Sequence, residues 1–244
     1  MRTQRTIKDF YVLYRISDAG NIKNKIADKI QCLKNALNVF NESIFIIFAD
    51  NVNESTNNLM IEAIKGHENV TIKYINCKSN PKSLRTLYEF AISLDDNDYV
   101  YFLEDDYLHL KNSFELIKEF AERNYTDYAT LYDHPDKYEE GCDFINPYCK
   151  NFGEHTYVFR TQHHHWKITN STTDTFAAFA DVLKRDKDLM WKYTDGRNYQ
   201  DFGRFIELYN NGIFLSSPIP SLSTHCEVGF IAPFVDWEKE TLFD

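Results

Sequence analysis

The sequence lacks the long apolar run that a membrane-spanning helix requires. No stretch of about 18 consecutive apolar residues occurs anywhere in the 244 residues. The segment after Met1 and Arg2 reaches the acidic Asp9 before any long apolar region forms, which also disfavours a secretory signal. We therefore expect no membrane span and a cytoplasmic protein.

Surplus positive charge is absent as well. Lys and Arg together number 27 against 37 Asp and Glu, so the formal net charge is −10. Proteins that bind nucleic acids without sequence preference do so through basic surfaces that attract phosphate groups. The charge balance therefore disfavours a nucleic-acid partner, although it leaves room for a local basic pocket.

Paired cysteines are also missing. The count of cysteines is odd and none of them forms a C-x-x-C pair, which favours reduced thiols over a disulfide framework or a structural zinc site. The five cysteines are Cys32, Cys77, Cys142, Cys149 and Cys226. The run His163-His164-His165 invites a zinc interpretation, but adjacent strand residues point to opposite faces, so at most His163 and His165 converge. We expect this run to lie in a hairpin over 157–169 whose His and Trp rings line an acceptor pocket.

Several nucleotide and hydrolase motifs do not occur. The chain has no P-loop, no G-x-G-x-x-G after a strand, no G-x-S-x-G and no H-E-x-x-H. Interpretations as an ATPase, a dehydrogenase, a serine hydrolase or a zinc protease therefore lose their usual support.

What the chain does contain is an alternation of two periodicities. Hydrophobic residues make up 43% of the sequence, as in ordinary globular proteins. Apolar runs predict strands over 10–16, 43–49, 70–75 and 99–103, and three- and four-residue spacings predict helices over 22–40, 59–64, 81–94 and 113–123. Such alternation predicts an α/β fold with a mostly parallel central sheet flanked by helices, because parallel strands are joined by helical crossovers.

The second half of the sequence has a different rhythm. We expect strands near 129, over 157–169 and over 213–215, and helices over 174–184 and 198–210. The residues Ser171 to Asp174 look like the start of the first of these helices. No Ser- or Gly-rich linker separates the halves, so a single domain over 1–244 is the simpler interpretation.

The most informative motif lies at the end of the fourth predicted strand. The apolar run 99–103 is followed directly by Glu104, Asp105 and Asp106. Carboxylates so close together repel one another, so a positive group is expected beside them. A hard divalent cation, which binds oxygen ligands, would serve as that group. Alternatively, these acids cap the helix that begins near Ser113, or face water.

With this motif the chain resembles the GT-A glycosyltransferases, particularly the family-2-like branch, whose D-x-D motif ends the fourth strand. The resemblance implies a Rossmann-like GT-A fold in which Asp106 holds Mn²⁺ or Mg²⁺, Asp105 assists, and Glu104 lies toward the nucleotide ribose. It places a nucleotide-sugar-binding half in 1–125 and an acceptor-side half in 126–244. The Q-x-x-R-W pattern of processive polysaccharide synthases is missing.

Other positions match the layout of this family. Asp18 and Asp50 end the first two strands, where the family surrounds the nucleotide base, and Arg85 lies in the helix before the fourth strand, where it would face the diphosphate. A solvated helix residue is the alternative for Arg85. The resemblance also implies that His225 is a metal ligand and that Asp201, in Gln200-Asp201, is the catalytic base, with Asp195 in reserve. An acid in the first turn of a helix is also favoured by the helix dipole alone.

These expectations combine into a metal-dependent glycosyltransferase. It would transfer one sugar from a nucleoside diphosphate sugar, with UDP or GDP, to a hydroxyl of a glycan or small molecule, with inversion. The alternatives are a metal-dependent phosphohydrolase or nucleotidyltransferase acting on nucleotide sugars, and a noncatalytic glycan-binding module.

Overall fold

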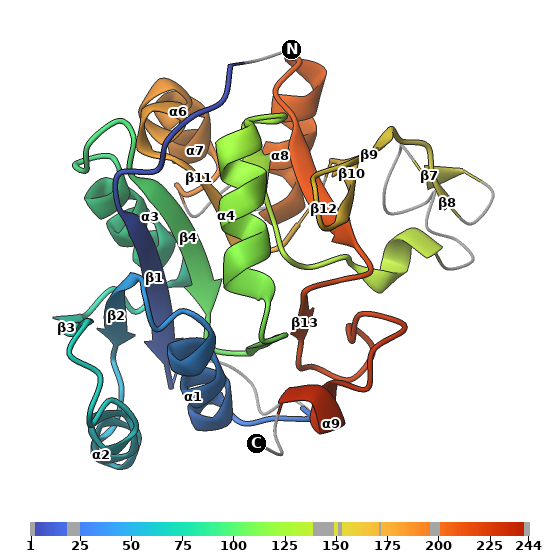
Figure 1. Ribbon diagram of the computed structural model, residues 1–244. Coiled ribbons are helices and arrows are strands. Elements are labelled where there is room, and N and C mark those ends of the chain that lie inside the picture. Colours follow the sequence, from blue (N-terminus) through green and yellow to red (C-terminus); the bar gives the residue numbers. More distant parts are fainter. Residues whose placement is uncertain are drawn as a thin grey trace.

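The computed structural model describes residues 3–18, 25–138, 149–150, 153–170, 172–195 and 201–241, and for 150, 201 and 202 it describes the backbone only. Within these residues a nine-stranded mixed sheet runs through the molecule (Figure 1). The order of its strands is β3 (Val70–Ile75), β2 (Ile44–Asp50), β1 (Phe10–Ser17), β4 (Tyr99–Glu104), β11 (Phe176–Phe179), β6 (Tyr128–Ala129), β12 (Leu215–Ile219), β10 (His165–Thr169) and β9 (Val158–Arg160).

Helices and two small strand pairs surround this sheet. The helices are α1 (Lys29–Val39), α2 (Glu54–Ala63), α3 (Asn80–Ala91), α4 (Ser113–Arg123), α6 (Ala180–Arg185), α7 (Lys187–Lys192), α8 (Asp201–Asn210), α9 (Trp237–Thr241) and the short 3₁₀ helix η1 (Pro135–Tyr138). The pairs are β5 (Tyr107–His109) with β13 (Ser223–His225), and β7 (Cys149–Lys150) with β8 (Gly153–Glu154). None of the helices among the described residues has the length and apolar character needed to cross a membrane.

The first half of the sheet confirms the predicted parallel strands. β1 pairs in parallel with β2 on one side and with β4 on the other, and β3 extends the sheet beyond β2. Val12, Leu13 and Tyr14 are fully buried, as expected for a strand covered on both faces. The pairing places Arg15 opposite Glu104 and Ser17 opposite Asp50, so the polar strand ends meet at one edge of the sheet.

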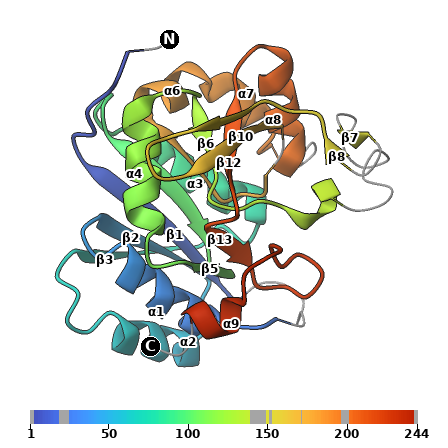
Figure 2. The same ribbon diagram turned by 45° about the vertical axis from the view of Figure 1, so that its right-hand side comes forward.

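Aromatic packing joins the helices to the two faces of the sheet. On one face Phe102 stacks on Tyr88 of α3, with ring centroids 5.6 Å apart. On the other face Phe10 of β1 packs against Phe114 of α4 at 5.1 Å, and Phe40 at the end of α1 joins them. Figures 1 and 2 show α1 and α4 in front of the parallel strands, with α3 behind them.

The prediction of a helix over 174–184 is wrong for its first part. Phe176–Phe179 form strand β11, which pairs antiparallel with β4, and helix α6 begins only at Ala180. All four strand residues are buried, and Phe176 stacks on Phe102 at 4.7 Å. A short, fully apolar run fits a buried strand and a buried helix equally well, so its periodicity did not distinguish them. Asp174 consequently precedes a strand and does not lie in a first helical turn.

Two other boundaries also differ from expectation. Helix α1 begins at Lys29 rather than near residue 22, because Asp28 caps it: one carboxylate oxygen accepts from the backbone N–H groups of Ile30 and Gln31 at 2.8 and 2.9 Å. The side chain of Gln31 accepts in return from the Asp28 backbone N–H at 2.8 Å, which completes a capping box. The last strand of the sheet, expected over 213–215, lies at Leu215–Ile219.

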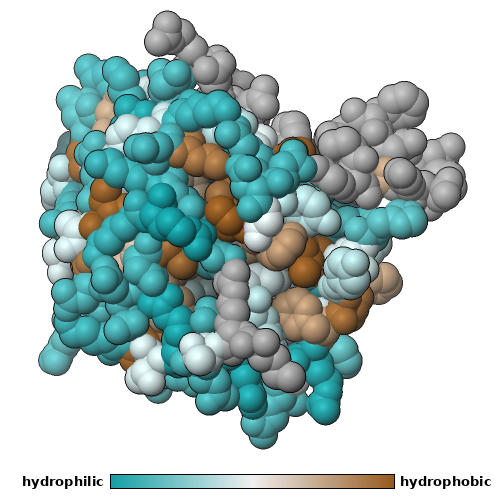
Figure 3. Space-filling view, turned by 90° about the horizontal axis from the view of Figure 1, so that it is seen from above, coloured by the Kyte–Doolittle hydropathy of each residue, from teal (hydrophilic) through white to brown (hydrophobic). Residues whose placement is uncertain are grey.

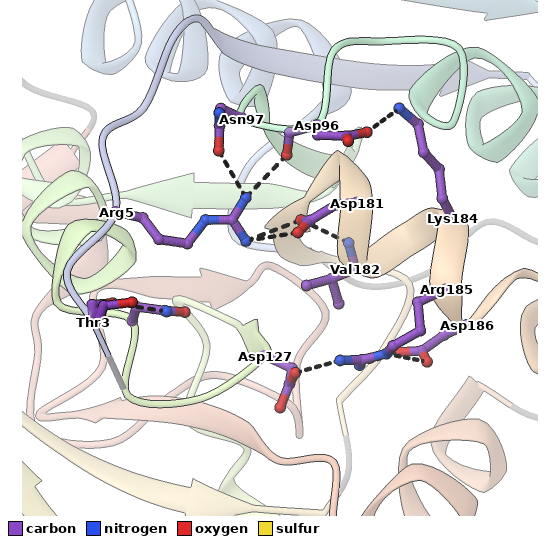
Figure 4. Close-up of polar contacts among 11 residues, drawn as sticks. Thr3, Arg5, Asp96, Asn97, Asp127, Asp181, Val182, Lys184, Arg185 and Asp186 are labelled. Carbon is purple, nitrogen blue, oxygen red and sulfur yellow. Dashed lines mark hydrogen bonds and ion pairs between the residues drawn. The ribbon is translucent and has the colours of Figure 1, made fainter. Parts of the chain in front are cut away.

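The amino-terminal segment is bound at the opposite end of the parallel strands from Glu104. Arg5 forms an ion pair with Asp181 at 2.9 Å and donates to the carbonyl oxygen of Asp96 at 3.1 Å (Figure 4). Its guanidinium also lies 3.7 Å from the ring centre of Phe179. Seen from this end, the surface carries mostly hydrophilic side chains with scattered hydrophobic ones (Figure 3).

The capping box of α1 should contribute measurably to stability. Replacing Asp28 by Ala removes the acceptor of two helix N–H groups and should lower the free energy of unfolding by about 1 kcal/mol. Urea denaturation checks this value. Ser79→Ala is the matched control, because the side chain of Ser79 makes no capping hydrogen bond at the start of α3, and its effect should stay within about 0.5 kcal/mol. Equal effects of the two changes would contradict the role of Asp28.

Candidate active site

Each of the three consecutive carboxylates at the end of β4 has a cationic side chain beside it. The three cations come from β1, from the segment between β1 and α1, and from the first residue of α1. The alternative in which the acids cap the helix at Ser113 does not apply, since strand β5 follows them directly. The pairs are Arg15 with Glu104, Lys29 with Asp105 at 3.7 Å, and Lys25 with Asp106 at 2.9 Å.

Glu104 belongs to a buried chain of charges that reaches into the second half of the sequence. Arg15 forms an ion pair with Glu104 and lies 3.6 Å from Asp174, which in turn pairs with Arg204 of α8 at 2.6 Å. Arg15, Asp174 and Arg204 are 6%, 3% and 1% exposed. Burial raises the pKa of Glu104, and the nearby Asp174 adds to this effect, while Arg15 opposes it. This chain fixes β1, β4, β11 and α8 relative to one another.

Sequence reasoning did not single out Arg15, Asp174 or Arg204 as a unit. The sequence did contain a signal for a buried ion pair: Arg15 lies within an apolar strand and Arg204 within an amphipathic helix. A buried charge requires a partner of opposite charge. The identity of the partner follows only from the fold, since Asp174 lies far from both arginines in the sequence.

Asp105 and Asp18 lie on either side of Lys29. Asp105 accepts a hydrogen bond from the backbone N–H of Ser17 at 3.0 Å, and burial raises its pKa. Asp18 pairs with Lys29 at 2.9 Å and accepts from the backbone N–H of Asn53 at 2.7 Å. Burial tends to raise the pKa of Asp18, but the hydrogen bonds that it accepts outweigh this effect and lower the pKa. Asp18 therefore joins the end of β1 to the start of α2.

Asp106 meets His225, as the resemblance implied. The antiparallel pairing of β5 with β13 places His225 opposite Tyr107, and the Nε2 atom of His225 lies 3.4 Å from the Oδ2 atom of Asp106. The Nδ1 atom of His225 accepts the backbone N–H of Glu227 at 3.1 Å. A ring nitrogen that accepts an N–H carries no proton, so the proton of neutral His225 is on Nε2. The role of this pair as metal ligands stays a prediction.

As arranged, these side chains do not fit a divalent metal ion. The Oδ2 atom of Asp106 faces the ammonium of Lys25 and the protonated nitrogen of His225, so both neighbours are hydrogen donors rather than ligands. Over the described ranges, no group of three or more His, Cys, Asp or Glu side chains is placed to hold a metal.

Asp50 and Arg85 each bind a neighbouring segment of the chain. Asp50 is 4% exposed and accepts from the backbone N–H of Cys77 at 2.8 Å, so it ties the end of β2 to the segment after β3. Arg85 donates to the Thr194 hydroxyl at 3.1 Å and to the Trp191 carbonyl oxygen at 2.7 Å, and so joins α3 to the end of α7. Their assignment to nucleotide-sugar binding stays a prediction.

The side chain of Asp201 lies outside the described residues. Its backbone is the first residue of α8, three positions before Arg204, which faces Asp174. The start of α8 therefore lies beside the buried charge chain, while Asp195, the reserve candidate, is exposed.

The histidine run lies in a hairpin, as expected, but its rings do not converge. The Nδ1 atom of His163 lies 2.8 Å from the carboxylate of Glu119 in α4, and the Nε2 atom of His164 lies 2.9 Å from the carbonyl oxygen of Pro220. Trp166 is fully buried and packs on Phe120 at 4.2 Å. Its ring is part of the core, so the expectation that it lines an acceptor pocket is wrong.

Comparisons with known proteins found solved structures with a similar arrangement of strands. A crystal structure of residues 1–349 of S. aureus TarS, a glycosyltransferase, matches with a TM-score of 0.52 and 13% identity, over 86% of this chain and 57% of that one. A longer TarS structure matches with a TM-score of 0.53 and 13% identity, over 86% of this chain and 35% of that one. The chain has the GT-A fold.

The GT-A fold is what these similarities establish. No protein-family model matches the sequence, and no curated protein matches it. The chain spans less than two thirds of each TarS structure, and the identity is low.

The buried charge chain should be sensitive to the loss of a single charge. Replacing Asp174 by Asn keeps the shape of the side chain but leaves Arg204 and Arg15 without their shared carboxylate, which should cost about 3–5 kcal/mol of unfolding free energy. The control is Glu62→Gln, which breaks the exposed Glu62–Lys65 pair and should cost less than about 0.5 kcal/mol. Chemical denaturation measures both, and similar costs would contradict the buried network.

Proposed function

We propose that this chain transfers a sugar from a nucleoside diphosphate sugar to a hydroxyl of a glycan or small molecule. The observation that supports this most is the position of the three carboxylates with their cations. Strands β2 and β4 lie on opposite sides of β1, so the strand order reverses next to β1. Ligands of open α/β sheets bind outside the carboxyl ends of the strands at such a switch point. Glu104, Asp105 and Asp106 lie at that place.

The reaction has simple requirements there. The acceptor oxygen forms a bond to the anomeric carbon while the bond from that carbon to the diphosphate oxygen breaks, and the diphosphate leaves with the electron pair. We assign the proton of the acceptor hydroxyl to Asp201, with Asp195 in reserve, and a single displacement of this kind inverts the anomeric centre. The departing diphosphate needs positive groups already in place where its charge develops.

Two sources of positive charge are available. The form implied by the family resemblance uses Mn²⁺ or Mg²⁺ on Asp106 and His225, and it requires the metal to displace the ammonium of Lys25 from Asp106. The other uses the side-chain cations themselves. In either form, residues 1–125 would bind the nucleotide sugar, through Asp18, Asp50, Arg85, Glu104 and Asp105, and residues 126–244 would bind the acceptor.

A thermal-shift series tests donor binding. Nucleoside diphosphates based on uridine, guanosine and the other bases are added with and without Mn²⁺, because a ligand that binds only the native state raises the melting temperature. We expect one base to stabilise the protein by about 2–3 kcal/mol at a concentration near 100 times its dissociation constant. A lack of response to every nucleotide would contradict the proposal.

Activity tests the assigned base and the reaction class. Asp201→Asn should keep nucleotide binding and reduce sugar transfer about 10²- to 10⁴-fold, whereas Asp195→Asn should transfer at nearly the normal rate. Near-normal transfer by Asp201→Asn would show that the assignment is wrong. Release of sugar 1-phosphate instead of nucleoside diphosphate would favour the phosphohydrolase or nucleotidyltransferase alternative, and glycan binding without any response to nucleotide sugars would favour a binding module.

A further inference from the structure

We propose that Lys25 is the resident cation of the diphosphate site, so that a nucleoside diphosphate binds without a divalent metal. This inference rests on the proposed function, since it assigns the group that meets the diphosphate of the same donor. It starts from the disagreement described above, in which the carboxylate expected to hold a metal faces an ammonium group instead.

The backbone holds Lys25 at this place. Lys25 forms an isolated antiparallel bridge with Glu227, and the next residue, Ile26, donates its N–H to the carbonyl oxygen of Cys226 at 3.0 Å. Cys226 in turn donates its own N–H to the carbonyl oxygen of Asp106 at 2.8 Å. The segments around Lys25, Asp106 and Cys226 are thus joined by main-chain hydrogen bonds. These bonds hold the backbone of Lys25 where its ammonium group contacts Asp106.

The side-chain contacts around Asp106 favour an ammonium group over a metal ion. The Nζ atom of Lys25 lies 2.9 Å from the Oδ2 atom of Asp106, and the protonated Nε2 of His225 approaches the same oxygen at 3.4 Å. A metal bound to both residues would have to displace the ammonium. It would also require His225 to carry its proton on Nδ1, which would end the hydrogen bond from Glu227.

Lys25 is placed to serve a phosphate group as well as Asp106. Its side chain is 25% exposed, and an ammonium carries three N–H donors, so it can hold Asp106 and still donate to phosphate oxygens. Lys29 lies 3.7 Å from the neighbouring Asp105 with its side chain 29% exposed, which adds a second cation to the same strand end. When the anomeric carbon–oxygen bond breaks, the electron pair goes to the diphosphate oxygen, which accepts a hydrogen bond from Lys25.

Calorimetric titration with the nucleoside diphosphate that gave the thermal shift tests the inference, in EDTA and in Mn²⁺. The wild-type protein should bind it in EDTA with an affinity within about threefold of that in Mn²⁺. Lys25→Met should weaken binding in EDTA by roughly 10- to 100-fold, the size expected for a lost charge-assisted hydrogen bond. Because this change removes the ammonium from Asp106, Mn²⁺ should restore part of the binding, which a merely structural lysine would not cause.

A matched control and the wild-type protein make the outcome unambiguous. Lys34→Met removes an exposed lysine of α1 away from Asp106 and should leave both titrations unchanged. Wild-type binding that appears only with Mn²⁺ would overturn the role of Lys25 and leave the transferase proposal standing. An absence of nucleotide binding in both solutions would overturn both. The wild-type comparison decides the point even where Lys25→Met fails to fold.

Discussion

The repulsion among Glu104, Asp105 and Asp106 is the constraint that organises this molecule. A buried strand places three adjacent carboxylates at one edge of the sheet, where burial and the charge of Asp106 raise the pKa values of Glu104 and Asp105. Each carboxylate has a cation from the neighbouring β1–α1 unit: Arg15 lies in β1 opposite Glu104, Lys25 lies between β1 and α1, and Lys29 begins α1. The place where the strand order reverses is therefore also the place where opposite charges are concentrated.

Much of the fold was accessible from local pattern, and the exceptions share a physical cause. The buried parallel strands β1, β2 and β4 and the helix α4 were predicted closely, since buried strands and amphipathic helices carry clear patterns over their whole length. Strand β11 was not, because a short apolar run such as Phe176–Phe179 fits either kind of element until its partner β4 is known. The pair β5 and β13 escaped notice since each strand has only three residues and pairs with a distant segment.

The candidate site, like the fold, was predictable only where a local pattern in the sequence encodes it. The acidic strand end was apparent in the sequence, and the meeting of Asp106 with His225 was implied by the resemblance. The cations were not apparent, because the sequence does not show which carboxylate the fold will place beside a lysine before a helix or an arginine in a strand. Lys25 is the clearest case: strand-like bonds with the segment after β13 place it beside Asp106, and no local pattern encodes them.

A crystal structure of the protein with a bound nucleoside diphosphate tests the central claim most directly. The account predicts the diphosphate at the carboxyl ends of β1 and β4, within hydrogen-bond reach of the Lys25 ammonium. A diphosphate bound elsewhere would contradict it, for example in the cavity of about 550 Å³ that Lys34, His109 and Lys111 line.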